Sequence, residues 1–316
     1  MADPSVEPVP TVDLGPLFEG DRIDTVVEAI DDALTRAGGF VVSGFPDAQG
    51  LDERGRRMLE FFDLPPSVRM ACATRATNPD NANIYRGYVS LLDGGSFARN
   101  EMFDIGPATP VSGPRMPGIE ILRERNAWPA EMPHAGWRAA MLGWYVQMRH
   151  VGLAVMFAVA KATGVDAATL GPLFQDGNST LRLLNYPEDV ADGEALAAGR
   201  HTDGAGLSLL WQGEPGLQVE GPDGVWRDVP SVSDSVSVHL GDVLEAVTDG
   251  AIPATPHRVL ASGTPRRSIG FFLEPALGAP LKPARADAED PSNTYAAHLL
   301  RRLRTYDGIG DFIPDP

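Results

Sequence analysis

The chain contains very little cysteine: Cys72 is the single cysteine among 316 residues, so no disulfide can form within it. That is typical of proteins that fold in a reducing compartment, and it favours a cytoplasmic location. Cys72 lies in the segment Met-Ala-Cys-Ala-Thr, with no obvious base near it in the sequence. We therefore predict a structural role for this thiol rather than a nucleophilic one.

Basic residues are also scarce, since 26 Lys and Arg stand against 43 Asp and Glu and the formal net charge is −17. Nucleic-acid-binding domains usually carry a basic patch or stripe, and the sequence has no such stripe, so we expect no nucleic-acid partner. The nearest approach is the run Arg301-Arg302-Leu303-Arg304. We interpret it as the solvated face of a terminal helix.

Long hydrophobic runs are missing as well. The most apolar stretch, Val151 to Val159, is too short to span a bilayer and is flanked by Arg149, His150 and Lys161, so it predicts a buried helix and no membrane partner. The acidic, Pro-rich N-terminus has neither a basic segment nor an apolar segment of the secretory kind.

What is present is typical of a soluble globular protein, with 43% hydrophobic and 22% charged residues. After Thr180, short β-rich runs are separated by Gly, Pro and Asp at the spacing of an all-β sandwich. No clear linker divides the chain, so we predict one structural unit over 1–316. The periodicity predicts helices over 24–36, 51–62, 136–164 and 293–304, an irregular stretch over 73–100, and strands over 12–14, 40–42, 101–105, 181–186, 207–211, 217–220, 226–229, 236–240, 257–260 and 268–273.

His201, Asp203 and the more distant His257 are the candidate metal ligands. Residues i and i+2 of an extended chain point to the same side, so His201 and Asp203 can reach one ion, and the third ligand must come from another strand. Two histidines and one carboxylate bind non-haem Fe(II) on one face and leave the other face open. The same ligands also suit zinc.

Several further segments follow one another in a characteristic order: Gly39-Phe40-Val41-Val42, Arg86-Gly87-Tyr88, Leu-Arg-Leu-Leu-Asn-Tyr-Pro at 181–187, His-Thr-Asp-Gly at 201–204, Gly-Asp-Val-Leu-Glu-Ala at 241–246, Pro-His-Arg-Val at 256–259 and Arg-Arg-Ser-Ile-Gly-Phe-Phe at 266–272. In these segments and their order, the chain resembles the Fe(II)/2-oxoglutarate-dependent oxygenases of the isopenicillin N synthase-like family.

The resemblance implies a mainly β fold with flanking helices (α+β), built on a distorted double-stranded β-helix, or jelly roll. It implies an oxygenase core over 178–276 and an N-terminal helix and strand region over 8–110. The long helical segment is expected to pack against the larger sheet.

The resemblance also implies cofactors and their ligands. His201, Asp203 and His257 would bind Fe(II), with 2-oxoglutarate and O2 as co-substrates and ascorbate as an additional reductant. Arg266 and Ser268 match the family's Arg-x-Ser element, which holds the far carboxylate of 2-oxoglutarate, and Tyr186 matches a tyrosine that assists it.

Strand alternation places Arg267 on the other face of that strand, where we expect it to be exposed. His239 stands where the family more often has Asn, and we interpret it as a structural histidine or one that supports the ligands.

For the substrate, the resemblance points to Arg86, which matches a position that contacts a substrate carboxylate in isopenicillin N synthase. A surface role for Arg86 is equally open. Phe103 and Phe272 are candidates to line the pocket, with core packing as the alternative for each.

The predicted function is a 2-oxoglutarate-dependent Fe(II) dioxygenase that oxidises a C–H bond of a small molecule by hydroxylation, desaturation or cyclisation, in bacterial secondary metabolism. The carboxylate of Asp203 favours such chemistry over halogenation, because related halogenases have a small residue at this position. The alternatives are a 2-oxoglutarate-independent oxidase or cyclase of the isopenicillin N synthase type, a zinc hydrolase, and a non-catalytic binding module.

Overall fold

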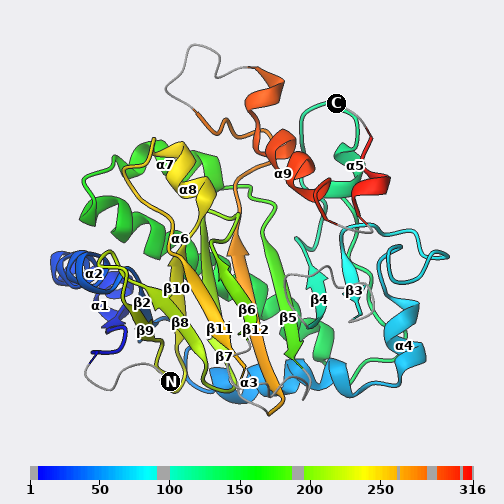
Figure 1. Cartoon of the computed structure of the whole chain (residues 1–316), viewed down its shortest axis with the longest axis horizontal. Helices are drawn as coiled ribbons and strands as arrows, with labels where there is room; N and C mark the ends of the chain where they lie inside the picture. The colour runs from blue at the N-terminus through cyan, green and yellow to red at the C-terminus, as the bar shows by residue number, and fades with distance from the viewer. Residues whose placement is uncertain are drawn as a thin grey trace.

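The computed structural model describes residues 6–90, 100–186, 196–261, 264–282, 290–306 and 309–314. Within these residues the chain forms an eight-stranded and a four-stranded sheet (Figure 1). The large sheet has the order β1 (Thr11–Asp13), β2 (Phe40–Ser43), β10 (Val236–Leu240), β7 (Leu207–Gln212), β12 (Arg266–Leu273), β5 (Thr180–Tyr186), β4 (Glu101–Ile105) and β3 (Gly87–Val89). The small sheet has the order β6 (Leu196–His201), β11 (His257–Leu260), β8 (Leu217–Glu220) and β9 (Trp226–Asp228).

The two sheets pack face to face. Val41 and Leu210 of the large sheet lie in one apolar cluster with Ala198, Val219 and Val259 of the small sheet. All neighbouring strands of both sheets are antiparallel except β1 and β2, which are parallel. This arrangement confirms the predicted class, a jelly-roll core with flanking helices.

Helices cover the other face of the large sheet (Figure 1). The helices on this face and elsewhere in the described residues are α1 (Gly15–Glu19), α2 (Ile23–Ala37), α3 (Leu51–Met58), α4 (Pro66–Ala71), α5 (Ile119–Leu122), α6 (Trp137–Ala162), α7 (Ala167–Phe174), α8 (Asp242–Val247) and α9 (Tyr295–Leu303), with short 3-10 helices at Leu59–Asp63, Pro291–Asn293 and Gly310–Phe312. No helix among the described residues is long and apolar enough to cross a membrane.

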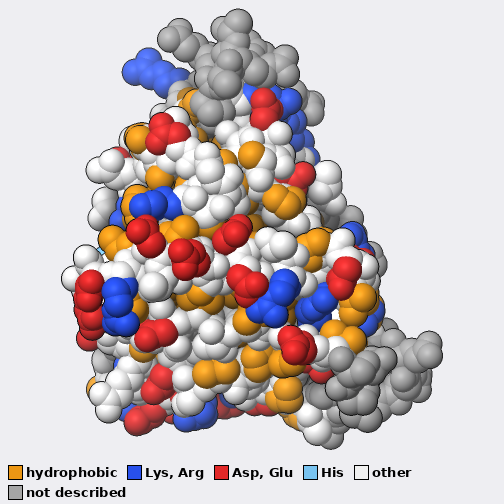
Figure 2. Space-filling model, turned by 90° about the vertical axis from the view of Figure 1, so that its left-hand side faces the viewer, with side chains coloured by type: hydrophobic (Ala, Val, Ile, Leu, Met, Phe, Trp, Pro, Cys, Tyr) orange, Lys and Arg blue, Asp and Glu red, His pale blue; other side chains and the backbone are white. Residues whose placement is uncertain are grey.

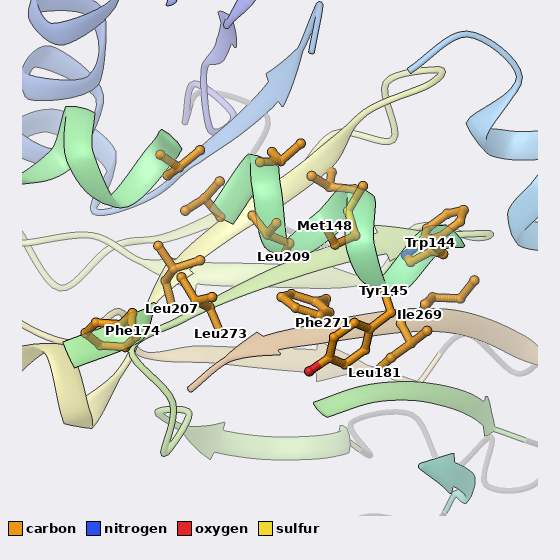
Figure 3. Packing of buried hydrophobic residues seen from close by; sticks show 14 of the residues in the cluster. Trp144, Tyr145, Met148, Phe174, Leu181, Leu207, Leu209, Ile269, Phe271 and Leu273 are labelled. Carbon is orange, nitrogen blue, oxygen red and sulfur yellow. The ribbon is translucent and has the colours of Figure 1, made fainter. Parts of the chain in front are cut away.

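The long helix α6 packs against the large sheet, as predicted, and gives that sheet two different faces. Apolar side chains of two central strands point at α6: Leu207, Leu209, Ile269, Phe271 and Leu273 (Figure 3). Because side chains alternate along a strand, Ser208, Arg266 and Ser268 point the other way, toward the small sheet. We call that side of the large sheet its inner face.

Most predicted elements occur, with local differences. The helix predicted over 51–62 ends as an α-helix at Met58 and continues as a 3-10 helix to Asp63. The helical segment stops there because Leu64, the residue before Pro65, is extended. The strands β3 and β6 and the helix α7 were not predicted, since Gly87, Gly199 and Pro172 are poor formers of those elements. Residues 91–99 of the predicted irregular stretch, and Pro187, lie outside the described residues.

The surface in Figure 2 carries acidic and basic side chains side by side, and its hydrophobic side chains form small groups. A hollow of about 390 Å³ lies between α6 and α7. It is lined by Leu153, Met156, Phe157, Ala167, Leu170, Gly171, Pro172 and Gln175, none of which is titratable. The hollow therefore offers no acid, base or metal ligand, and the candidate catalytic groups lie on the inner face instead.

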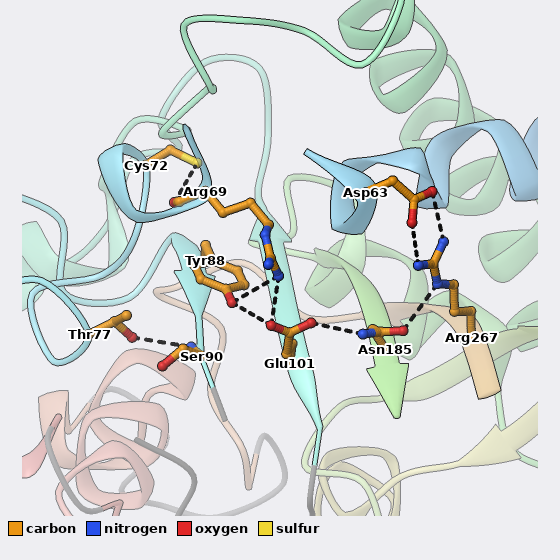
Figure 4. Close-up of polar contacts among 9 residues, drawn as sticks. All are labelled: Asp63, Arg69, Cys72, Thr77, Tyr88, Ser90, Glu101, Asn185 and Arg267. Carbon is orange, nitrogen blue, oxygen red and sulfur yellow. Dashed lines mark hydrogen bonds and ion pairs between the residues drawn. The ribbon is translucent and has the colours of Figure 1, made fainter. Parts of the chain in front are cut away.

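A polar network joins α4 to the edge of the large sheet (Figure 4). Oε1 of Glu101 accepts hydrogen bonds from Arg69 Nη1 at 2.7 Å and from the Tyr88 hydroxyl at 2.6 Å, and Oε2 accepts one from Asn185 at 2.8 Å. The side chains of Arg69 and Glu101 are only 15% and 13% exposed. Removing either charge would leave its partner in a poorly hydrated site.

We therefore expect Glu101→Ala to lower the free energy of unfolding by about 3 kcal/mol. Urea denaturation followed by circular dichroism measures this change. Glu120→Ala is the matched control, because Glu120 pairs with Arg123 while 80% of its side chain is exposed, and we expect no measurable change there. Equal stability of the two variants would contradict the prediction.

Candidate metal centre and co-substrate pocket

The structure brings together the three predicted metal ligands. His201 is the last residue of β6, His257 is the first residue of β11, and the two are paired across the small sheet, with ring centroids 4.1 Å apart. Asp203 lies in the loop after β6, where its oxygens are 3.8 Å from His201 Nε2 and 3.7 Å from His257 Nε2. One donor atom from each residue lies within 4.8 Å of the others, so all three can contact one ion.

Hydrogen bonds orient each of these side chains. The Nδ1 atom of His201 is 2.7 Å from the Gly199 carbonyl oxygen, and Nδ1 of His257 is 3.1 Å from that of Thr255. A carbonyl oxygen can only accept, so Nδ1 carries the proton in both rings and the Nε2 lone pairs point toward Asp203. The Ser208 hydroxyl donates to Oδ2 of Asp203 at 2.5 Å.

The charges also suit a divalent cation. Burial, with the neighbouring His257, lowers the pKa of His201, so its imidazole is neutral at pH 7. Burial raises the pKa of Asp203, but His257, His201 and the Ser208 hydrogen bond outweigh it, so the pKa lies below its ordinary value. Two imidazoles and one carboxylate whose donor atoms face one another fit Fe(II) in a site with open positions.

His239 lies beside this cluster without contributing to it. Its ring centroid is 4.6 Å from that of His257, its Nε2 lies 3.0 Å from the Ser237 hydroxyl, and its side chain is fully buried. Burial lowers its pKa well below the ordinary value. His239 is therefore a neutral side chain that packs against the ring of His257.

Arg266, Ser268 and Tyr186 also meet on the inner face. Nη1 of Arg266 donates to the Ser268 hydroxyl at 3.3 Å, Nη2 donates to Gln212 Oε1 at 3.4 Å, and its guanidinium lies 5.5 Å from the centre of the Tyr186 ring. The side chain is only 4% exposed, yet its Nε has no hydrogen-bond partner and no described residue forms an ion pair with it.

An unpaired buried cation is costly, and burial accordingly lowers the pKa of Arg266. No described residue supplies a carboxylate in ion-pair contact with Arg266. A carboxylate would match its planar guanidinium in a two-pronged contact. The residues present therefore fit the far carboxylate of 2-oxoglutarate.

Arg267 points to the opposite side of β12, as predicted, but it is not exposed. Its side chain is 32% exposed, its guanidinium pairs with Asp63 at 2.6 Å, and its Nε donates to Asn185 at 3.1 Å (Figure 4). The expectation of an exposed Arg267 was wrong because the short helix Leu59–Asp63 covers this end of the sheet.

The substrate candidates fall in different places. Phe272 is on the inner face and partly exposed. Phe103 is fully buried on the helix side of the sheet, where its ring lies 4.3 Å from that of Phe61, so lining the pocket is excluded for it and core packing is its role. Arg86 is 1% exposed and donates to the Thr180 hydroxyl at 2.6 Å and the Asn178 carbonyl at 3.1 Å. Its contact with a substrate carboxylate stays a prediction.

Ser208 and Gln212 were not predicted as site residues. Both alternate with the apolar residues of β7 that face α6, and this pattern of isolated polar residues inside an apolar strand could have indicated them.

Arg302 was also missed: α9 carries it to Gly204, beside Asp203, whereas a solvated helix face was predicted. Only the packing of α9 onto the loop after β6 places it there.

A second buried carboxylate, Glu274, follows β12. Burial raises its pKa from 4.5 to about 7, although Arg86 opposes the shift. The folded state thus binds the proton more tightly than the unfolded chain does. The resulting stabilisation is complete below pH 4.5 and is lost as the pH rises toward 7.

We expect Glu274→Gln to be more stable than the wild type at pH 8, by roughly 2–3 kcal/mol, and equally stable at pH 4.5. Urea denaturation at the two pH values measures this, with the exposed Glu120→Gln as control. A stability difference that does not change with pH would argue against a buried, proton-binding Glu274.

Comparison with known proteins agrees with this geometry. Residues 177–275 match the model of the 2OG-Fe(II) oxygenase superfamily, and residues 9–131 match that of the N-terminal region of the non-haem dioxygenases in morphine synthesis. The chain belongs to the Fe(II)/2-oxoglutarate-dependent oxygenases of the isopenicillin N synthase-like family. It is a 2-oxoglutarate-dependent Fe(II) dioxygenase.

Two curated relatives of this dioxygenase span nearly its whole length. Isopenicillin N synthase of Streptomyces clavuligerus is 29% identical, covering 94% of each chain. The 2-oxoglutarate-dependent dioxygenase citB of Monascus ruber is also 29% identical, covering 94% of this chain and 95% of the relative. The crystal structure of a full-length Neurospora crassa protein in complex with α-ketoglutarate (2-oxoglutarate) has a TM-score of 0.71 at 25% identity, covering 92% of this chain and 93% of that one.

Proposed function

We propose that this dioxygenase oxidises a C–H bond of a small molecule, with His201, Asp203 and His257 as the Fe(II) ligands. Arg266, Ser268 and Tyr186 hold the far carboxylate of 2-oxoglutarate. Bound Fe(II) supplies the activation of O2, coupled to the oxidative decarboxylation of 2-oxoglutarate to succinate and CO2. A place in bacterial secondary metabolism stays a prediction that rests on the family resemblance.

The observation that carries the proposal is the pairing of two sites across one cleft. Three metal-donor atoms lie within 4.8 Å of one another, and the inner face opposite them carries the buried Arg266 without an anion. A dicarboxylate that chelates a metal at one end and meets a guanidinium at the other satisfies both.

The protein's own contribution is to orient and to exclude water. Carbonyl oxygens of Gly199 and Thr255 fix the tautomers of His201 and His257, and Ser208 holds the Asp203 carboxylate. Ala198 of β6 and Val259 of β11, which lie on the same strands as His201 and His257, belong to the apolar cluster between the two sheets. The carboxylate at position 203 favours hydroxylation, desaturation or cyclisation over halogenation.

A second candidate is an oxidase or cyclase that takes all its electrons from the substrate. The 29% identity to isopenicillin N synthase of Streptomyces clavuligerus supports it. A zinc hydrolase would use the same three ligands, and a binding module without turnover would have the same fold. The test below distinguishes these two from each other, from the oxidase and from the proposed dioxygenase.

The test loads the purified protein with Fe(II) under argon, adds a library of small molecules and admits O2. We expect succinate to form only when Fe(II), 2-oxoglutarate and O2 are all present, and to form faster with a substrate. Product without 2-oxoglutarate would favour the oxidase, turnover under argon would favour the hydrolase, and failure to bind iron would favour the binding module. Each of these three outcomes overturns the proposal.

A further inference from the structure

The inner face of the large sheet continues past Arg266 and Ser268. Arg182 of β5 and Phe272 of β12 are partly exposed there, although their neighbours Leu181, Leu183 and Phe271 on the helix side are fully buried. The accessible part of the inner face therefore extends across β12 to β5.

Arg182 is held rigidly in this space. Its Nε and Nη2 donate to the two oxygens of Asp104 at 2.8 and 2.7 Å, and its guanidinium stacks 5.4 Å from the centre of the Phe272 ring. Asp104 is 3% exposed and lies beneath the arginine. No described residue accepts a hydrogen bond from Nη1, so one edge of a fixed guanidinium remains available.

Phe272 lies between this arginine and the metal ligands. It is paired with Ser208 across β7 and β12, and Ser208 donates to Asp203. Arg182 belongs to the next strand, β5, so it stands about 10 Å, or two strand spacings, from the metal side of the sheet. A molecule anchored at Arg182 would lie across the Phe272 ring to reach the metal.

The C-terminal helix brings a second guanidinium to the same cleft. Arg302 of α9 donates from Nε to the Tyr306 hydroxyl at 3.0 Å and from Nη1 to Asp242 at 3.3 Å. A Cβ atom at position 204 would overlap its guanidinium, which therefore lies directly against Gly204, next to Asp203. No described residue accepts from Nη2, and 34% of the side chain is exposed.

An aromatic ring accompanies each cation: Phe272 lies beside Arg182, and Tyr306 accepts a hydrogen bond from Arg302. Burial lowers the pKa of Arg182, but Asp104 and, more weakly, Tyr85 and Tyr306 raise it above its ordinary value. Guanidiniums with a remaining donor beside aromatic rings suit an anionic group attached to an apolar body. An amine at the same place would face two like charges.

The charge of the whole molecule makes this local arrangement informative. The formal net charge is −17, so the protein repels anions at long range and attracts cations. That long-range field is screened within about 10 Å in physiological salt, so the groups nearest a ligand decide its binding. Each arginine is balanced by a carboxylate, Arg182 by Asp104 and Arg302 by Asp242, and each keeps a donor for which no described residue supplies an acceptor. Such donors favour a ligand that carries hydrogen-bond-accepting oxygens, as a carboxylate does.

We propose, on the basis of the proposed function, that the substrate is a small monocarboxylic acid with an aromatic or alicyclic body. Its carboxylate contacts Arg182 and Arg302, and its body packs on Phe272 with one C–H bond toward the metal. This assignment uses different residues from the predicted substrate contact at Arg86.

The test compares acids with their neutral isosteres. Phenylacetate, 3-phenylpropanoate, indole-3-acetate and their primary amides are titrated by calorimetry, under argon, into protein loaded with Mn(II) and 2-oxoglutarate. We expect the acids to bind about tenfold or more tightly than the amides, because a charge-assisted hydrogen bond contributes this much. Equal binding of acids and amides, or no binding by any of the acids, overturns the proposal.

Two variants locate the effect. Arg302→Gln is expected to abolish the preference for acids, and Arg301→Gln, an exposed neighbour on α9, is expected to keep it. Arg182→Lys is used in place of a neutral residue, because a neutral residue would leave Asp104 buried without its cation. We expect it to weaken acid binding while 2-oxoglutarate binding remains.

Failure of this proposal differs from failure of the proposed function. If the Mn(II) protein does not bind 2-oxoglutarate, the proposed function is wrong. If it binds 2-oxoglutarate and shows no preference for acids, or if Arg302→Gln retains that preference, only the substrate class is wrong.

Discussion

Replacing His201 with alanine is expected to weaken Fe(II) binding by more than about 100-fold and to reduce succinate formation by about three orders of magnitude. Loss of a residue that merely orients a metal ligand costs about 10- to 100-fold in affinity, so loss of a ligand should cost more. The two remaining donors, Asp203 and His257, cannot cover one face of the ion. Anaerobic calorimetry with Fe(II) and a succinate assay measure the two effects.

The fold should survive this change. His201 is the last residue of β6, 22% of its side chain is exposed, and the hydrogen bond of its Nδ1 is to Gly199 in the same strand. His150→Ala is the matched control: His150 is exposed on α6 and contacts Phe18 edge to face. Should His201→Ala bind Fe(II) as tightly as His150→Ala does, the assigned metal centre would have to be abandoned.

Arg266→Gln and Arg267→Gln are expected to have opposite effects, although the two residues are adjacent. Arg266 faces the cleft, so its loss should raise the KM for 2-oxoglutarate by about 10- to 150-fold, the equivalent of a charge-assisted contact of 1.5–3 kcal/mol. Because no described residue forms an ion pair with Arg266 and its Nε has no hydrogen-bond partner, the variant should be at least as stable as the wild type without 2-oxoglutarate.

Arg267→Gln should leave the KM for 2-oxoglutarate unchanged and should lower stability, because it removes the ion pair with Asp63 and the hydrogen bond to Asn185. Steady-state kinetics and urea denaturation on both variants measure the two properties. A similar rise in the KM for 2-oxoglutarate in both variants would mean that the positive charge on β12 matters and that the face on which each arginine lies does not. It would refute the assigned pocket.

The local sequence pattern gave correct predictions where a residue's role depends only on its position within its own strand. The His-x-Asp pair and the later histidine predicted a cluster that the described residues do form, because His201 and His257 end up paired on adjacent strands. Alternation along β12 correctly separated Arg266 from Arg267. The apolar stretch Val151 to Val159 lies in α6, as predicted.

The sequence pattern was insufficient where a residue's role depends on which element packs over its strand. Phe103 and Phe272 are both aromatic residues in predicted strands, yet their registers place one under α6 and the other in the cleft. The strand β6, which ends at His201, was missed because Gly199 and a run of alanines give it no clear strand signal.

For this dioxygenase, the sequence by itself indicated the family through the resemblance of its ordered motifs. Residue type and short-range spacing also indicated the candidate metal-donor residues and most strands of the core. Only the tertiary structure decided that Arg266 forms no ion pair with a described residue, that Phe103 is core, and that Arg302 reaches the loop after Asp203. The physical reason is that burial and charge pairing depend on contacts between segments distant in the chain, such as α9 and the loop after β6.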